Sequence, residues 1–387
     1  LEALHINAAF IFLLYLLRSV STYLFFAYKS AIVKANQKEY LLNVISYVFT
    51  VGAGIVQIIF LWIWPSFEVY VLLSVLQIIF QNVACAYLSD KMYPYINEKT
   101  SENIGIGEVK EIFKDCAALF LYKLNGVVLK ATDNIVLSMF MGLDMVALYS
   151  NYYVFYTSIN TLFSKIFNSV SHSLGNLHTD NDRDHEYQIF QTVHLLTTIL
   201  GGTAGVGIYV VADEFIHAWI GTDWIIPQPF SLLMGIELYT LASRISLSKY
   251  RTTMGLFQQA KYRPLAGMLI NLVMSVGLVR SWGICGVLVG TIIADWTTFM
   301  WFDPLIIHKN GFENKFSVMG YYGKLLKYTV VTALAGQLSY VICGHLLTGY
   351  GWLSVMIHAM ICALIVPAAV LLVSLRNQEG QYVLRLG

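Results

Sequence analysis

Residues 350–374 read YGWLSVMIHAMICALIVPAAVLLVS, a run of 25 residues without a single Asp, Glu, Lys or Arg. A helix of about 20 apolar residues is long enough to cross the hydrocarbon core of a bilayer. The run contains Pro367 and Gly351, which membrane helices tolerate. This stretch therefore predicts a membrane-spanning helix.

The same signal recurs along the whole chain. Of 387 residues, 57% are hydrophobic and only 12% are charged, and the mean hydropathy is +0.63. A soluble protein of this size needs more polar surface, and most apolar segments here are apolar all round. The sequence therefore predicts an all-α, polytopic membrane protein with about eleven spans. They lie at 6–26, 41–62, 67–88, 114–140, 145–170, 189–211, 228–248, 264–281, 284–306, 324–346 and 350–374.

The positive charges test this number of spans. With the first span ending in the cytoplasm, nineteen of the 24 Lys and Arg residues fall in loops on the cytoplasmic side. A miscounted span would invert every later loop, so the positive-inside rule supports both the number and the orientation. On the opposite side, we expect the loop at 212–227 to be an amphipathic segment lying on the membrane.

Composition also excludes other classes of protein. The net charge is +1, so the chain lacks the basic surface typical of nucleic-acid binding. Its five cysteines have no paired spacing and are typical of small buried hydrophobic residues. The sequence contains no H-E-x-x-H, G-x-S-x-G or P-loop motif. We expect neither an enzyme nor a bound cofactor or metal.

Two predicted cytoplasmic loops resemble each other. Residues 28–40 read YKSAIVKANQKEY, and residues 250–262 read YRTTMGLFQQAKY. The identical pairs are Tyr28/Tyr250, Gln37/Gln259 and Tyr40/Tyr262, and Lys29/Arg251 is a conservative pair. The loops lie six spans apart, and an even separation indicates a parallel repeat about an axis along the membrane normal.

This repeat predicts the domain organisation. Residues 1–88 form a partial N-terminal bundle of three spans, and residues 89–113 form a cytoplasmic linker. Residues 114–310 form a six-helix bundle, and residues 311–387 add two helices. If the halves are equivalent, three further helices are expected before Leu1.

Four basic residues fall inside apolar spans, where each costs about 2.5–3.5 kcal/mol unless it faces water or a partner. These residues are Arg18, Lys123, Lys130 and Arg244. Lys123 and Lys130 are seven residues apart, so they share a helix face with Asn134. Such stripes predict a cationic, water-filled cavity suited to a phosphate or diphosphate. Arg244 lies near the cytoplasmic end of its span, so an alternative to a role in the cavity is that its side chain snorkels to the membrane interface.

Two other predicted helices carry similar polar stripes. Glu237 lies seven residues before Arg244 on one of them, and Asn151 begins the stripe on the other. Asp133 is a possible structural partner of Lys130 at helical spacing. Asp295 lies in the middle of a span, where it is a candidate for proton or sodium coupling or for an interhelical hydrogen bond.

Short motifs along residues 20–265 give the chain a resemblance to a known family. They are DNIVLS at 133–138, Gly142, LYSNYY at 148–153, STYLF at 21–25, ANQK at 35–38, Tyr93-Pro94, SLGN at 173–176, WIG at 219–221, GLF at 255–257 and KYRP at 261–264. In this order they resemble the polysaccharide flippases of the multidrug/oligosaccharidyl-lipid/polysaccharide exporter superfamily. The resemblance implies two six-helix bundles around a central cavity, with two extra C-terminal helices in many members.

The resemblance also implies a function. Such proteins move undecaprenyl-diphosphate-linked oligosaccharide across the bacterial cytoplasmic membrane by alternating access, for O-antigen or capsule synthesis. Arg18, Lys123, Lys130 and Arg244, with Asn134 and Asn151, are then expected to bind the substrate. Asp133, Glu237 and Asp295 are expected to couple an ion. Expected partners are membrane lipids, a polysaccharide polymerase and glycosyltransferases. The alternatives are a multidrug exporter, whose cationic substrates favour acidic spans, and a polymerase or ligase, which normally carries a large external loop.

Overall fold

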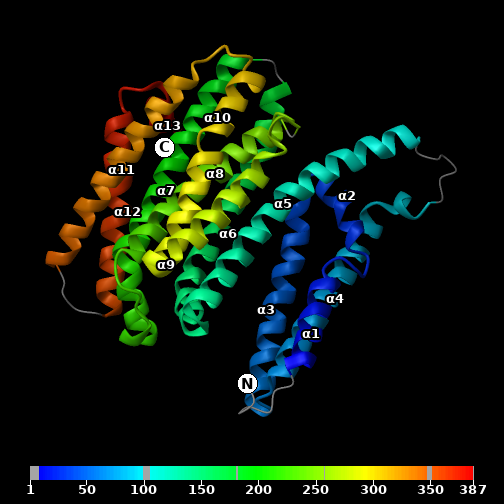
Figure 1. Ribbon diagram of the computed structural model, residues 1–387. Helices are drawn as coiled ribbons and strands as arrows, with labels where there is room; N and C mark the ends of the chain where they lie inside the picture. Colours follow the sequence, from blue (N-terminus) through cyan, green and yellow to red (C-terminus); the bar gives the residue numbers. More distant parts are fainter. Residues whose placement is uncertain (1–7, 99–104, 180–181, 257, 347–350, 387) are drawn as a thin grey trace. The chain divides into compact units, whose positions relative to one another are not determined.

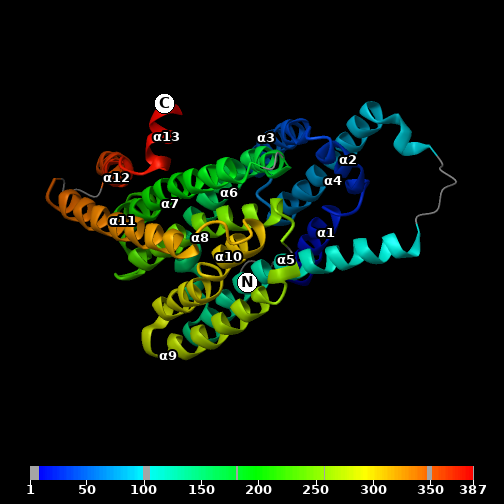
Figure 2. The same cartoon turned by 90° about the horizontal axis from the view of Figure 1, so that it is seen from above.

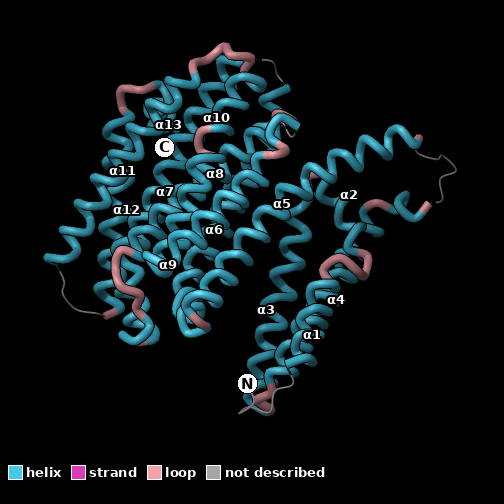
Figure 3. The backbone as a smooth tube through the Cα atoms, in the orientation of Figure 1, coloured by secondary structure: helices cyan, strands magenta, loops and turns pink. Residues whose placement is uncertain are grey.

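The computed structural model describes residues 8–98, 105–179, 182–256, 258–346 and 351–386 (Figure 1). Within some helical stretches, residues 121–131 and 169–179 among them, it describes the backbone alone. Every regular element in these ranges is a helix, and Figure 3 shows helices joined by short loops. The prediction of an all-α chain is confirmed.

Seven helical segments of the described chain are long and apolar enough to cross a membrane. They are Glu39–Ile63, Phe67–Met92, Arg183–Ile220, Phe230–Thr253, Gln258–Gly311, Val318–Leu346 and Trp352–Ser374. The predicted first span appears as a shorter apolar helix, Phe10–Ser21. The predicted spans 114–140 and 145–170 are helical, but they are outside these seven segments. The chain is a multi-pass membrane protein.

The chain divides into two compact units, Leu1–Gly105 and Ile106–Gly387. The first unit contains α1 (Ala8–Ser21), η2 (Ala27–Lys29), α2 (Ser30–Ala35), α3 (Glu39–Ile63), α4 (Phe67–Met92) and η3 (Pro94–Asn97). Helix α4 packs against both α1 and α3. Its N-terminus is capped by Ser66, whose hydroxyl accepts a hydrogen bond from the Val69 amide at 3.4 Å.

The second unit begins with α5, within the segment 89–113 that the sequence assigns to a linker, so residues 106–113 are helical. Its elements are α5 (Ile106–Met141), α6 (Leu143–Thr179), α7 (Arg183–Ile220), η4 (Thr222–Trp224), α8 (Phe230–Thr253), η5 (Gln258–Ala260), α9 (Arg263–Thr298), α10 (Phe302–Ile306), the π-helical turn η6 (Ile307–Gly311), α11 (Val318–Leu346), α12 (Trp352–Ser374) and α13 (Gln378–Leu386).

Helix α7 is the centre of this unit, because it packs against α6, α8, α11, α12 and α13. Figures 1 and 2 both place α12 alongside α7. Glycines let α7 and α8 approach closely: a Cβ atom at Gly205 would lie 2.5 Å from the carbonyl oxygen of Gly235. In a membrane, where no hydrophobic driving force brings helices together, small residues at a crossing allow the close backbone contact that stabilises helix packing.

Helix α9 is a hairpin of two helical segments. Gly283 separates them with φ 55° and ψ −136°, a conformation that a side chain would strain. Beyond the turn, Gly290 lies against the Ser275 backbone, and the Asn271 side chain reaches Thr291 across the hairpin. The break that the sequence predicts between residues 281 and 284 is therefore present.

One sequence expectation differs from the structure. The sequence predicts a loop with an amphipathic segment at 212–227, but residues 212–220 continue the long helix α7, which ends at Ile220. Ala212 and Ile216 are buried in the core that this unit builds around α8. Asp213 accepts a hydrogen bond from the Tyr152 hydroxyl at 2.8 Å, which ties this end of α7 to α6.

Candidate functional site

Buried acidic side chains gather where α5, α8 and α9 meet inside the second unit. Asp133 on α5, Glu237 on α8 and Asp295 on α9 are 8%, 8% and 3% exposed. Asp133 lies within electrostatic range of both other carboxylates. Buried carboxyl groups in one apolar bundle need positive charge or protons to compensate them.

One of these carboxylates has a cationic partner. The Arg244 Nη1 atom on α8 donates to both carboxylate oxygens of Asp295, at 3.0 and 2.9 Å. The guanidinium also lies 5.5 Å from the centre of the Phe299 ring. The structure thus contains the interhelical hydrogen bond that was one of the two interpretations of Asp295, and it places Arg244 in an ion pair.

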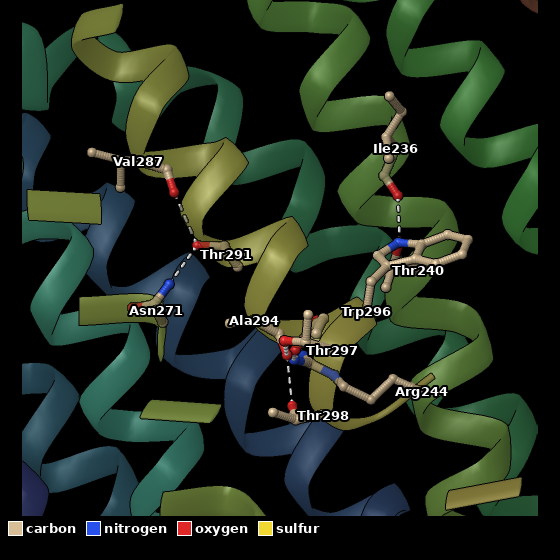
Figure 4. A network of polar contacts seen from close by, with 11 residues as sticks. Ile236, Thr240, Arg244, Asn271, Val287, Thr291, Ala294, Trp296, Thr297 and Thr298 are labelled. Carbon is tan, nitrogen blue, oxygen red and sulfur yellow. Dashed lines mark hydrogen bonds and ion pairs between the residues drawn. The ribbon is translucent and has the colours of Figure 1, made fainter. Parts of the chain in front are cut away.

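A row of oxygen atoms lies beside Asp133. The Asn271 amide nitrogen donates to the Thr291 hydroxyl at 2.8 Å, and that hydroxyl donates to the Val287 carbonyl at 3.2 Å (Figure 4). The Ser275 hydroxyl reaches the same carbonyl at 3.4 Å. Asp133 interacts through its side chain with both Asn271 and Thr291.

Two oxygens of this row stand out. The Oδ1 atoms of Asp133 and Asn271 are buried and have no hydrogen-bond partner among the described groups. A buried acceptor without a donor costs about 1–3 kcal/mol, and more when it is charged. Carboxylate, amide, hydroxyl and carbonyl oxygens are also the ligands that hard cations prefer. The arrangement fits a small monovalent cation or a proton.

Three tyrosines of α6 lie within electrostatic range of Glu237. Tyr149, Tyr153 and Tyr156 all interact electrostatically with this carboxylate. Their rings pack in sequence, with centroids 5.4 Å apart for Tyr149 and Tyr153 and 5.2 Å apart for Tyr153 and Tyr156. The acidic groups therefore lie in a closely packed environment with phenol hydroxyls nearby.

Residues 7–227 match the family model described as "Polysaccharide biosynthesis protein". This segment is more than half of the chain. The chain belongs to this polysaccharide biosynthesis family.

The fold of this family member is similar to that of a solved structure titled "Lipid II flippase MurJ, inward closed conformation". The two share 13% sequence identity with a TM-score of 0.55, over 93% of this chain and 74% of that one. At this identity the similarity concerns the fold. No curated protein matches the sequence significantly.

The residues expected to bind substrate are distributed over both units. Arg18 lies in the last turn of α1 and is exposed. Asn134 is exposed next to the buried Asp133, and Asn151 is half-buried on α6. The backbone of Lys123 and Lys130 belongs to α5, but their side chains lie outside the described residues.

The two loops of the internal repeat hold equivalent ion pairs. Lys29 lies 2.6 Å from Asp90, near the end of α4. Its repeat counterpart Arg251 lies 4.0 Å from Asp303 in α10, and Arg263 pairs with the same carboxylate. In each unit, a basic residue of the loop therefore contacts an acidic residue near the end of the second long helical segment that follows the loop, which supports the sequence alignment of the loops.

Several site residues were not singled out from the sequence. Asn271, Ser275 and Thr291 are uncharged, and their only signal was polarity at helical spacing within the two apolar segments of α9. His358 is a further example, because its Nδ1 lies 2.8 Å from Glu214 Oε2 on α7. Such pairs join residues far apart in the chain, which periodicity alone does not indicate.

Proposed function

We propose that this protein moves lipid-linked oligosaccharide from the inner to the outer leaflet of the bacterial cytoplasmic membrane. Its substrate is an oligosaccharide on undecaprenyl diphosphate, and transport proceeds by alternating access between the two halves. Membership of a polysaccharide biosynthesis family and the fold shared with a lipid flippase support this function. The residues identified act in binding and transport, and no catalytic step is assigned to them.

The observation that carries the proposal is the buried polar cluster of α5, α8 and α9. Ionisable residues inside apolar spans are costly and are retained where they line an ion or substrate path. Asp295 is paired with Arg244, but a buried oxygen of Asp133 and one of Asn271 have no hydrogen-bond partner among the described groups, which a purely structural role does not explain.

We assign ion coupling to this cluster. Asp133 and Asn271 supply buried oxygens, and Thr291 and the Val287 carbonyl complete an oxygen-rich set on both segments of α9. A bound sodium ion or proton would supply the positive charge that a buried carboxylate needs. Because Asp133 belongs to α5 and the other groups to α9, their closer association would draw these two helices together. Glu237 and Asp295 tune the local charge.

We assign substrate binding to the basic and amide side chains that the sequence indicated. Arg18, Lys123 and Lys130 attract the diphosphate, because charge-assisted hydrogen bonds to phosphate oxygens are the strongest polar contacts available. Asn134, Asn151 and Arg244 contribute further donors. A polymerase and glycosyltransferases that act on the same lipid carrier are the expected partners.

Replacing basic residues of α5 tests this assignment in cells. The double substitution Lys123→Ala and Lys130→Ala should abolish surface polysaccharide while leaving the amount of membrane-inserted protein unchanged. Lys110→Ala is the matched control, because Lys110 is an exposed lysine of the same helix. Normal surface polysaccharide in the double variant contradicts the binding role, and efflux of cationic drugs in its place favours the multidrug exporter.

A further inference from the structure

The first unit contains a polar pocket of its own. A cavity of about 540 Å³ lies between the end of α1, the η2–α2 segment, the start of α3 and the second half of α4. Ligand pockets typically have volumes of about 300–1,000 Å³, so the cavity has room for a small ligand. Its polar lining residues include Tyr23, Tyr28, Asn43, Ser46 and Gln81.

Much of this lining offers hydrogen bonds that the protein itself does not use. Among the described residues, no hydrogen bond engages the side chains of Asn43, Ser46 or Gln81. Asn82 donates to the carbonyl oxygens of Ser21, the last residue of α1, and of Leu24 in the turn that follows, so it shapes the pocket wall. The amide groups and the hydroxyl provide both donors and acceptors, as recognition of a polyhydroxylated ligand requires.

Two tyrosines complete the pocket. Tyr23 and Tyr28 are 83% and 69% exposed, so large parts of their rings are open to a ligand. An aromatic ring combined with amide and hydroxyl groups presents an apolar face beside polar groups. A sugar ring has the complementary surface, with one C–H face and a rim of hydroxyl groups.

The charges around the pocket disfavour an anion. Lys34, the lysine of the lining, lies 3.9 Å from Glu39, which also lines the pocket. Lys29, between two lining residues, is held by Asp90 at 2.6 and 2.7 Å. Each positive charge is thus matched by a carboxylate, so a diphosphate gains little here. An uncharged, hydroxyl-rich group fits better.

We propose that this pocket of the first unit binds the saccharide part of the transported lipid. The inference rests on the proposed function and adds a subsite to it: Asn43, Ser46 and Gln81 hydrogen-bond to sugar hydroxyls, and Tyr23 and Tyr28 contact the sugar ring. The diphosphate is bound elsewhere, by the basic residues already assigned to it.

A matched pair of alanines provides a binding test on the full chain in detergent. Ala27 lines the pocket, whereas the exposed Ala35 of the neighbouring α2 does not. Ala27→Cys and Ala35→Cys each introduce a thiol without removing a polar group. Maleimide labelling of each thiol is followed by mass spectrometry, which separates it from the native cysteines. The probe is the free oligosaccharide mixture released by mild acid from the lipid-linked pool of the cells.

Saturating probe should slow labelling at position 27 by about tenfold and leave position 35 unchanged, as expected when a bound ligand covers the first thiol alone. Inorganic pyrophosphate should protect neither thiol. Equal rates at position 27 with and without the oligosaccharide overturn the proposal, and so does protection by pyrophosphate instead.

Transport assays distinguish an error in the proposed sugar subsite from an error in the proposed transport function. Gln81→Ala should raise the substrate concentration for half-maximal transport by about five- to tenfold, because it removes one or two hydrogen bonds. Gln77→Ala, one turn earlier on α4 and outside the pocket, should leave it unchanged. If the unmodified protein transports and Gln81→Ala transports identically, the subsite is wrong. If the unmodified protein does not transport, the proposed function fails, and the labelling experiment still decides the subsite.

Discussion

Arg244 on α8 holds both carboxylate oxygens of Asp295 on α9 through a single guanidinium nitrogen, at 3.0 and 2.9 Å. The residues are 51 positions apart in the chain, and the Asp295 side chain is only 4% exposed. The ion pair therefore joins two helices, with the carboxylate buried and the guanidinium partly exposed. One of its members cannot be removed without leaving the other charge buried and uncompensated.

This relationship predicts an asymmetry between single and double variants. Arg244→Ala should lower the free energy of unfolding by about 3–5 kcal/mol, because the Asp295 carboxylate stays buried without its partner. The double variant Arg244→Ala, Asp295→Ala should be less destabilised than Arg244→Ala alone. Denaturation of the detergent-solubilised variants measures both values. Additive losses would show that the two side chains are not coupled.

The oxygen row beside Asp133 predicts that transport depends on a cation gradient. Asp133→Asn keeps the shape of the side chain but removes its charge, so transport should lose its response to a sodium or proton gradient. Asp144→Asn is the control, since Asp144 is an exposed residue in the first turn of α6. Transport by each reconstituted variant is measured with and without each gradient. An unchanged gradient response in Asp133→Asn would remove this carboxylate from the coupling site.

The crossing of α7 and α8 predicts a steric effect at one glycine. Gly205→Ala places a methyl group 2.5 Å from the Gly235 carbonyl oxygen, so the helices must separate. The expected loss is about 1–3 kcal/mol, typical of overpacking. Gly207→Ala, on the same helix, meets no atom within 4 Å and should cost little. Thermal unfolding of both variants provides the comparison, and equal melting temperatures would contradict the close approach.

The C-terminal helix α13 predicts a dependence of stability on pH. Burial raises the pKa of Glu379, but hydrogen bonds from Lys324, its own backbone amide and Tyr328 outweigh this, so the pKa lies below its ordinary 4.5. A lowered pKa in the folded state means that the carboxylate stabilises the fold above pH 4.5, and that this contribution disappears as the pH falls through the lowered pKa.

Glu379→Gln should therefore destabilise the protein by about 1–3 kcal/mol at neutral pH, through its charge-assisted hydrogen bonds, and should weaken the loss of stability on acidification. Glu108→Gln, at an exposed position in the first turn of α5, is the control. Unfolding curves between neutral and acidic pH test this. A Glu379→Gln variant with the acid sensitivity of the unmodified protein would disprove the role of this carboxylate.

The sequence predicted the helical architecture well, because a membrane-spanning helix can be recognised from the composition of a single continuous segment. The run at 350–374 is α12 almost residue for residue, and the interruption near Gly283 follows from the length of a span. The end of α7 was missed. Asp213 and Glu214 interrupt the apolar pattern there, but the structure satisfies them with Tyr152 and His358.

The candidate site was predictable only in part. Buried Asp133, Glu237 and Asp295 were identified because a charge in an apolar run is conspicuous. Their partners were not, since Asn271 and Thr291 are common in membrane helices and become informative only when the hairpin brings them together. The spacing of residues in the sequence shows which of them share one face of a helix. It does not show which other helix packs against that face.

The most direct measurement of the central claim is movement of lipid-linked oligosaccharide between leaflets. The purified protein is reconstituted into liposomes that carry this lipid, and a membrane-impermeant reagent reports the fraction of glycan exposed on the outside. The account predicts that the protein speeds the exchange between leaflets well above the protein-free rate, and that a cation gradient biases its direction. Exchange at the protein-free rate, with correctly folded protein in the membrane, would contradict it.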